Sequence, residues 1–430
     1  METVDLSFDK NMKRKQRKQR KHLKKKNPSS YKEKPAQDND EFKDTFKINQ
    51  ALRTENYNLL REIGRETGFT SDAIRRRVWP FLLHCTDLDQ DKVIEGSLDV
   101  PHKDEEQVNL DVIRSFNSFP KNLDEEDKEK LQKQLKNVIV HVLRSYPSLH
   151  YYQGFHDICS VFILLFGEKY ACKMMEPVAL FFLRDEMYVT MEPVLKQLTI
   201  LDTIIRLEDL ELYDFITEAG VLPYYCLSWV ITWCSHDLGD LDKITRLFDL
   251  FLSSNPFMAV YFAAAVVLSR RDQVLALPCD TSTIHSFLTK LPKDIDVDSL
   301  CQTACELEEK YSVFEIQCQS SIALDQVSAI NRFERDWLPL TSLQSLNDTI
   351  EDHIIPILQD KDERKPIELV STASNKQHVH QSKSILQRLQ QLDKKDAFLY
   401  TLLTVGAGVS LVAMFMSNSD MMRYVLLVCS

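Results

Sequence analysis

Apolar residues recur about every 3.6 positions from about residue 55 to about Leu307, and this is the period of an amphipathic α-helix. Stretches in which polar and apolar residues alternate, as in strands, are scarce. Glycine, which tight turns need, occurs only 9 times in 430 residues. The chain is therefore predicted to be all-α, and its 44% of hydrophobic residues can bury a sizeable core.

The clearest helix is predicted between Asn122 and Tyr146. Asn122 is in position to cap it, acidic residues fill its first turn, and Pro147 ends it. Its apolar face consists of Leu131, Leu135, Val138 and Val142. Further helices are predicted to begin near Phe155 and to lie on either side of Pro256.

Composition divides the chain into five parts. Residues 1–55 are predicted to be a basic disordered arm and a polar linker, and residues 56–310 a helical domain. In residues 311–396 helical pieces alternate with polar stretches, which is typical of a connector. Residues 397–416 are apolar, and residues 417–430 form a short tail.

The run Ala397–Met416 contains no charged residue. At about 1.5 Å per residue, a helix of this length crosses a hydrocarbon core of about 30 Å, whereas a buried core helix would be shorter or show a polar face. Lys394 and Lys395 precede the run and Arg423 follows it, a bias that places the preceding domain in the cytosol. The run is therefore predicted to be a single-pass transmembrane tail anchor.

Positive charge is concentrated near the N-terminus. The segment Lys10–Lys26 holds eleven Lys and Arg residues and no acid, although the whole chain carries a formal net charge of -11. Such a segment could bind anionic lipid, nucleic acid or a nuclear import receptor, or could be a solvated arm. It has no aromatic residue on which bases could stack, and this disfavours nucleic acid.

Several kinds of site are not expected. Ten cysteines are scattered without a CxxC pair or a cluster of histidines, so neither a metal site nor a disulfide framework is predicted. The GxxxxGK[ST], HExxH and GxSxG motifs do not occur. Two adjacent pairs, His156-Asp157 and His236-Asp237, are more typical of helix caps or buried histidines than of catalytic dyads.

Two short stretches carry side chains that a helical core does not require. In the first, Asp111 and Arg114 are three positions apart, so the carboxylate can hold the guanidinium from one helical turn away. In the second, Gln153 is followed by Gly154 just ahead of an apolar helix, which marks a backbone position that needs unusual room. An Asp-x-x-Arg pair alone is usually a surface salt bridge.

Together these stretches resemble the TBC domain of Rab GTPase-activating proteins, whose motifs are I-x-x-D-x-x-R and Y-x-Q-G. Here the first motif runs from Val108 to Arg114, with valine in place of isoleucine, and the second from Tyr151 to Gly154. Further stretches are similar to structural motifs of the family, and their matching residues are Arg75, Trp79, Trp229, Arg246 and Asp249. The resemblance implies an all-α TBC domain in which these five residues hold helices together.

The resemblance also implies a mechanism. In the family an arginine, here Arg114, neutralises charge on phosphate oxygens in the GTP site of a partner, and a glutamine, here Gln153, positions the attacking water. Asp111, Tyr151 and Gly154 would support these two catalytic side chains. Mg²⁺ and GTP would belong to the partner, a Rab GTPase in its GTP form, so no cofactor or metal of the chain's own is expected.

A TBC domain followed by a membrane span resembles the members of the family that are anchored in the endoplasmic reticulum. This implies an endoplasmic-reticulum membrane protein with its TBC domain in the cytosol, acting on Rab one-type GTPases in ER-to-Golgi vesicle transport. Two alternatives stay open. One is a membrane-anchored adaptor that binds a Rab without accelerating hydrolysis, and the other is a nucleic-acid-binding protein that uses Lys10–Lys26.

Overall fold

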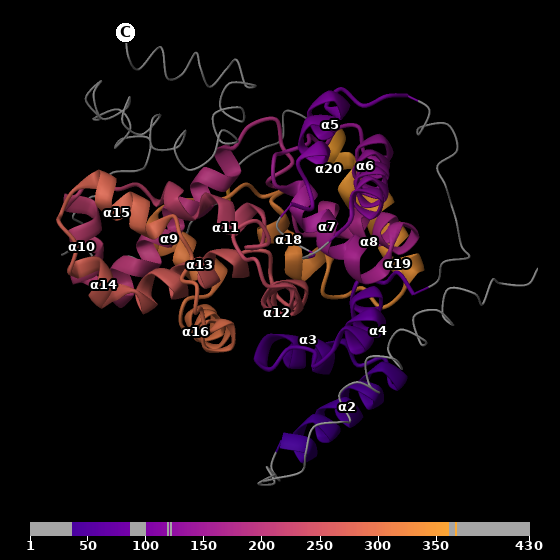
Figure 1. Ribbon diagram of the computed structural model, residues 1–430, viewed down its shortest axis with the longest axis horizontal. Coiled ribbons are helices and arrows are strands. Elements are labelled where there is room, and N and C mark those ends of the chain that lie inside the picture. The colour runs from indigo at the N-terminus through magenta and orange to yellow at the C-terminus, as the bar shows by residue number, and fades with distance from the viewer. Residues whose placement is uncertain (1–36, 87–99, 118–119, 121–122, 361–365, 368–430) are drawn as a thin grey trace, which may run out of the picture. The chain divides into compact units, whose positions relative to one another are not determined.

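The computed structural model describes residues 37–86, 100–117, 120, 123–360 and 366–367 (Figure 1). The chain divides into two units, Met1–Phe46 and Lys47–Ser430, and the division falls inside helix α2. Of the first unit the structure describes only the beginning of α2. The helices that form a common core belong to the second unit.

Within the described residues the regular elements are helices, and the only β-type contact is an isolated bridge between Asp325 and Pro366. The all-α prediction is confirmed. The helices are α2 (Gln37–Arg53), α3 (Tyr57–Glu66), α4 (Asp72–Leu82), α5 (Glu105–Ile113), α6 (Glu125–Ser145), α7 (Phe155–Phe166), α8 (Glu168–Phe181), α9 (Glu192–Glu208), α10 (Leu210–Glu218), η1 (Pro223–Cys226), α11 (Leu227–Ile231), α12 (Leu241–Leu252), α13 (Met258–Ser269), α14 (Arg271–Leu275), α15 (Thr281–Leu288), α16 (Val297–Lys310), α17 (Val313–Ser320), α18 (Ala329–Asp336), α19 (Leu343–Thr349), η2 (Ile350–Ile354) and α20 (Ile355–Gln359).

Helix α6 follows the predicted pattern but begins at a different cap. The side chain of Asp124 accepts a hydrogen bond from the backbone N–H of Asp127 at 2.8 Å, so Asp124 caps the helix. The cap predicted at Asn122 is therefore wrong, and Asn122 itself lies outside the described residues. The predicted apolar face is buried at Leu135, Val138 and Val142 and half-buried at Leu131.

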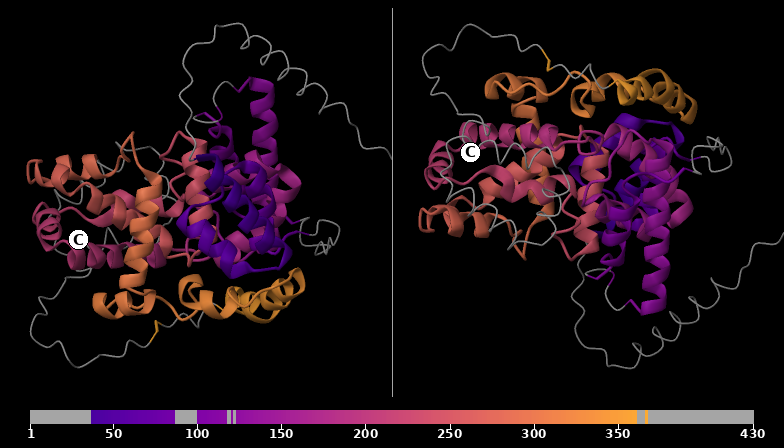
Figure 2. Two further views of the ribbon diagram at one scale, coloured as in Figure 1. Left: turned by 90° about the horizontal axis from the view of Figure 1, so that it is seen from below. Right: turned by 90° about the horizontal axis from the view of Figure 1, so that it is seen from above.

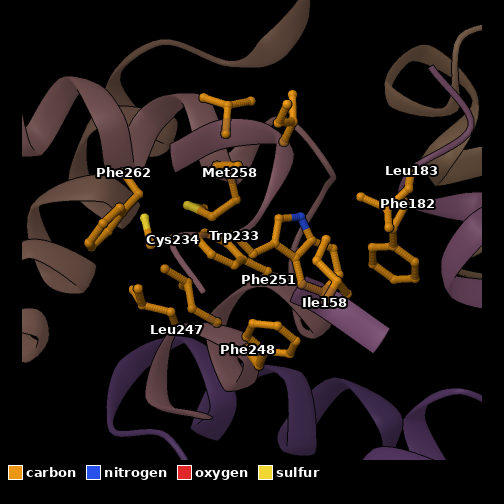
Figure 3. Close-up of a cluster of buried hydrophobic side chains, with 14 of the residues drawn as sticks. Ile158, Phe182, Leu183, Trp233, Cys234, Leu247, Phe248, Phe251, Met258 and Phe262 are labelled. Atoms are coloured by element: carbon orange, nitrogen blue, oxygen red, sulfur yellow. The ribbon is translucent and has the colours of Figure 1, made fainter. Parts of the chain in front are cut away.

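Helix α13 is apolar on all sides, and a helix of this kind belongs in the middle of a core. Its residues from Met258 to Val267 are buried, and it packs against α9, α11, α12 and α16. Close to it, Trp233 lies among side chains of α7 and α12, including Ile158 and Phe248 (Figure 3). The rings of Trp233 and Phe248 meet edge to face with 5.1 Å between their centroids. This cluster joins α7, which follows the glutamine motif, to the centre of the core.

The helices after α16 lie along the earlier helices of the second unit (Figures 1 and 2). Trp337 is buried, and its ring centroid is 4.9 Å from that of Phe181 and 5.1 Å from that of Phe182. The hydroxyl of Tyr57 donates a hydrogen bond to the carbonyl of Thr341 at 3.0 Å. The described part of the predicted connector, residues 311–360 and 366–367, therefore contains helices that pack against the preceding ones.

The linker prediction is wrong over Gln37–Arg53, which forms helix α2. Ile48 and Ala51 are three positions apart, and both are buried. Most other residues of this segment are polar, so its composition indicates a linker even though one narrow face supports a helix.

No helix of the described residues is long and apolar enough to cross a membrane. The predicted span Ala397–Met416, the tail 417–430 and the basic segment Lys10–Lys26 all lie outside those residues. The membrane anchor and the function of the basic segment therefore stay predictions.

Candidate functional site

A buried carboxylate, that of Asp249 on α12, ties this helix to α4. Asp249 accepts hydrogen bonds from Nη2 of Arg75 at 2.9 Å and from the indole N–H of Trp79 at 2.7 Å. It also accepts one from the backbone N–H of Phe69 at 2.9 Å. The side chain of Asp249 is fully buried, and these donors offset the loss of its hydration. This cluster holds helices together.

Arg246, one turn earlier on α12, binds the end of helix α3. Its guanidinium donates to the carbonyl oxygens of Gly64, Arg65 and Glu66, each at 3.1 Å. These are carbonyls of the last turn, which has no further helical N–H groups to pair with. Trp229, the fifth residue assigned a structural role, is buried on α11, where its ring meets that of Tyr225 with 6.4 Å between centroids.

Arg114 lies directly after the last residue of helix α5. Its side chain is 52% exposed and forms an ion pair with Asp111, whose side chain is only 1% exposed. The Nε atom of Arg114 also donates to the carbonyl of Leu110 at 3.2 Å. Because the carboxylate is held inside the protein, it fixes the direction in which the guanidinium leaves the helix.

Tyr151 connects the arginine motif to the glutamine motif. Its hydroxyl donates to Oδ2 of Asp111 at 2.9 Å and lies 2.8 Å from Nδ1 of His156. Burial raises the pKa of Tyr151 well above its ordinary value, and the neighbouring charge of Asp111 raises it further. The hydroxyl is therefore protonated at neutral pH and remains a donor. Arg114 and Tyr151, which belong to different motifs, thus share one buried carboxylate.

Gly154 occupies a position that other residues do not fit. Its φ is +122°, a conformation that L side chains rarely adopt, and an added Cβ would come within 2.8 Å of Cγ2 of Thr232. The preceding Tyr152 donates its hydroxyl to the carbonyl of Ile231 at 2.9 Å. The turn before α7 is therefore packed directly on the segment that follows α11. This is the room that the sequence indicates for the glycine.

Gln153 lies in this turn, and it is less exposed than the sequence suggests. A side chain that acts in the GTP site of a partner is expected to be exposed, but the Gln153 side chain is partly buried. Its Oε1 atom is enclosed and accepts no hydrogen bond from the described residues. An enclosed carbonyl oxygen without a donor is unfavourable by about 1–3 kcal/mol. The carboxamide is thus held at the turn by packing rather than by hydrogen bonds to its oxygen.

Three residues near the turn were not assigned to the site from sequence. His156 is buried against Tyr151. The Oδ2 atom of Asp157 lies 3.1 Å from Nδ1 of His236. His156 fits the expectation of a buried histidine. The two adjacent His-Asp pairs in the sequence are a signal, but only the fold shows that Asp157 of one pair meets His236 of the other.

Two apolar side chains are exposed close to Arg114. On α5, Leu110 is 56% exposed and Ile113 is 67% exposed. Large apolar residues beside an arginine are typical of surfaces that bind another protein.

Among the described residues, no group of three or more His, Cys, Asp or Glu side chains is arranged to hold a metal ion.

Comparison with known proteins identifies relatives of the chain. Residues 72–275 match the model of the family described as the Rab-GTPase-TBC domain. The chain is 39% identical over 277 residues to TBC1 domain family member 20 of Bos taurus, covering 64% of this chain and 69% of that protein. It is 35% identical over 271 residues to GTPase-activating protein gyp10 of Schizosaccharomyces pombe, covering 62% and 71% of the two chains.

A solved structure shows a similar fold. The Ypt/Rab-GAP domain of Gyp1p superimposes with a TM-score of 0.51 and 19% sequence identity, covering 59% of this chain and 93% of that chain. At this identity the likeness concerns the fold alone.

Proposed function

The chain belongs to the Rab-GTPase-TBC domain family, and we propose that it is a GTPase-activating protein that supplies Arg114 and Gln153 to the GTP site of a Rab GTPase. The observation that carries this proposal is the connection of both motifs through one buried carboxylate. Asp111 holds Arg114 on one side and Tyr151 on the other. The two candidate catalytic segments are therefore positioned as a unit.

In this proposal Arg114 acts on charge. Hydrolysis of GTP builds negative charge on the oxygens of the transferred phosphoryl group, and an arginine supplied from outside neutralises it. The planar guanidinium can contact two oxygens at once, which a lysine ammonium cannot do with the same geometry. Asp111 directs the guanidinium before the partner arrives, so less of the binding energy is needed to order it.

Gln153 acts on the attacking water. Its carboxamide can orient the water toward the phosphorus atom, once the side chain has turned out of the protein. Because Oε1 accepts no hydrogen bond from the described residues, this rotation breaks none on the oxygen side. Mg²⁺ and GTP are supplied by the Rab in this proposal.

The exposed apolar residues of α5 would form part of the docking surface. Leu110 and Ile113 flank the start of the Arg114 side chain and would be covered by the Rab when the guanidinium enters its site.

We further propose Rab one-type GTPases as the partners and the endoplasmic-reticulum membrane as the location, with the TBC domain in the cytosol. Support comes from similarity to TBC1 domain family member 20 and from the uncharged run Ala397–Met416. The segment Lys10–Lys26 would add contacts to anionic lipid.

A second candidate is an adaptor that binds a Rab without accelerating hydrolysis. The enclosed position of Gln153 favours it, since a glutamine that stays in the turn cannot reach a water molecule. The two candidates differ in one assay. The full chain in detergent is mixed with each of a panel of GTP-loaded Rab GTPases, and phosphate release is followed. Strong stimulation of a Rab one-type GTPase supports the proposal, whereas binding without stimulation supports the adaptor.

A further inference from the structure

His236 lies in the loop between α11 and α12, close to the turn that carries Gln153. Its side chain is 57% exposed, and its Nδ1 atom is 3.1 Å from Oδ2 of Asp157. Asp157 belongs to the first turn of α7 and is four positions after Gln153. The imidazole is thus held by the first turn of the helix that follows the glutamine.

The loop that presents His236 is held in an unfavourable conformation by the core. Trp233 has a φ of +52° and Cys234 one of +60°, although neither is glycine, and both are almost fully buried. Figure 3 shows the two side chains among the aromatic and aliphatic residues of the central cluster. Backbone strain of this kind persists where the surroundings enforce it, and it is concentrated at functional sites. Since Thr232 packs on Gly154, this loop and the glutamine turn are in direct contact.

One ring nitrogen of the exposed His236 side chain is paired with a carboxylate. Asp157 pairs with Nδ1, while the neighbouring carboxylate of Asp237 accepts a hydrogen bond from the Ser228 hydroxyl at 2.8 Å. The Nε2 atom has no hydrogen bond to the described residues. The hydrogen bond to Asp157 raises the pKa of His236 to about 9, so the ring carries a positive charge at neutral pH. His236 is therefore a cationic donor of fixed orientation on an exposed surface.

We propose that His236 is a docking residue whose Nε2–H group binds an acidic side chain on the surface of the GTP-loaded Rab. The inference rests on the proposed partner but not on the finger chemistry of Arg114 and Gln153. A half-exposed cation at the rim of an interface adds attraction to an opposite charge and helps to set the choice of partner. It would therefore act on the affinity between the two proteins and leave the hydrolysis step unchanged.

The test measures the dissociation constant of the full chain, in detergent, for a Rab one-type GTPase loaded with a non-hydrolysable GTP analogue. His236→Phe should raise this constant about fivefold, the factor expected at the upper end for an exposed ion pair. His236→Lys, which keeps a positive charge, should restore most of the affinity. The matched control is His353→Phe, because His353 is 44% exposed and its Nδ1 is also 3.1 Å from a carboxylate, that of Asp336 on α18. This control should bind as the unchanged protein does.

Each outcome has a defined meaning. An unchanged dissociation constant for His236→Phe overturns the inference, and so does an equal loss in the His353→Phe control. A fall in kcat with unchanged affinity also overturns it, because His236 would then act on the phosphate or on the turn. If the Arg114 and Gln153 variants keep their stimulation of hydrolysis but His236→Phe binds more weakly, the proposed mechanism fails and the docking role stands.

A pH series gives a second test. The titratable groups that act on His236 are Asp157 on α7 and Asp237 in its own loop, and His156 on α7 lies against the other oxygen of Asp157. With a pKa of about 9 the ring stays charged between pH 6 and 8, so the affinity attributable to it should be constant there. Asp157→Asn removes the group that raises the pKa, which should fall toward the ordinary value of about 6.5. The dissociation constant of this variant should then rise with pH over the same interval, and a flat profile would contradict the inference.

Discussion

Asp111 is the residue on which the geometry of the site depends. It is buried at the end of α5, pairs with Arg114 and accepts a hydrogen bond from Tyr151. Asp111→Asn keeps the shape of the side chain and a neutral acceptor but removes the charge that orients the guanidinium. We expect kcat for stimulated GTP hydrolysis to fall about 10²-fold, since small misplacement of a catalytic group has an effect of this order. Steady-state kinetics at saturating GTP-loaded Rab checks this, and a kcat near that of the unchanged protein would contradict the positioning role.

Gly154 supports the site through the backbone. Gly154→Ala places a methyl group 2.8 Å from Thr232 and forces a φ of +122° on a residue with a side chain. Strain of this kind is worth about 1–3 kcal/mol, so the midpoint of thermal unfolding should fall by several degrees. The control is Gly239→Ala, because an added Cβ there meets nothing within 4 Å. Equal melting temperatures for the two variants would refute this account of the turn.

At this scale, the sequence could predict contacts within one helix but not contacts between segments. The spacing of Asp111 and Arg114 indicates their ion pair, and the structure contains it. No spacing indicates that Tyr151 reaches Asp111, or that His236 reaches Asp157, because these contacts depend on how the helices pack. The burial of the Gln153 carboxamide was not expected for the same reason.

Between elements, a buried carboxylate connects α12 to α4. Asp249→Ala would leave Arg75 buried without its carboxylate and Trp79 without its acceptor. Removing one partner of a buried ion pair is expected to lower the free energy of unfolding by about 3–5 kcal/mol. Urea denaturation followed by circular dichroism measures this loss. The control is Asp272→Ala, because Asp272 also pairs with an arginine, Arg271, but its side chain is 93% exposed. A loss as small as that of the control would show that the cluster contributes little.

Helices could be predicted from sequence where apolar residues repeat over several turns. They could not be predicted where only a few buried residues pack the helix against the domain. Helices α6 and α7 show several turns of apolar periodicity, and both lie where the sequence places them. In helix α2, burial is known for residues 45–53, and only Ile48 and Ala51 among them are buried. So few apolar positions give the segment the composition of a linker. In the predicted connector several side chains are buried, among them Ile330, Phe333 and Trp337. Its helices are short, however, and α17 and α18, with 8 residues each, do not repeat an apolar pattern over several turns.

For the whole molecule, the domain is longer than the motifs indicate. The matched family region ends at residue 275, whereas packed helices continue to α20. In the proposed function two segments determine the membrane location of the protein. They are the run Ala397–Met416 and the basic segment Lys10–Lys26. Neither overlaps the residues that form the site.

The anchor prediction is tested by extraction. Because Ala397–Met416 is uncharged and long enough to span, the full chain should stay in endoplasmic-reticulum membranes during treatment with alkaline carbonate. A chain that ends before Lys394 should be released and should still stimulate hydrolysis. Recovery of the full chain in the carbonate supernatant would contradict the tail anchor.

The central claim is that the molecule brings two catalytic groups to its partner, and single-turnover hydrolysis by a Rab one-type GTPase tests it most directly. Circular dichroism run in parallel establishes that the variants are folded, as expected for two side chains that are not part of the core. An arginine finger is worth about 10³–10⁵ in rate, so Arg114→Ala and Arg114→Lys should both reduce hydrolysis nearly to the intrinsic rate of the Rab. Gln153→Ala should also be severely impaired while the Rab still binds. If folded Arg114→Ala and Gln153→Ala proteins each kept more than about a tenth of the rate, the two-finger mechanism would be contradicted.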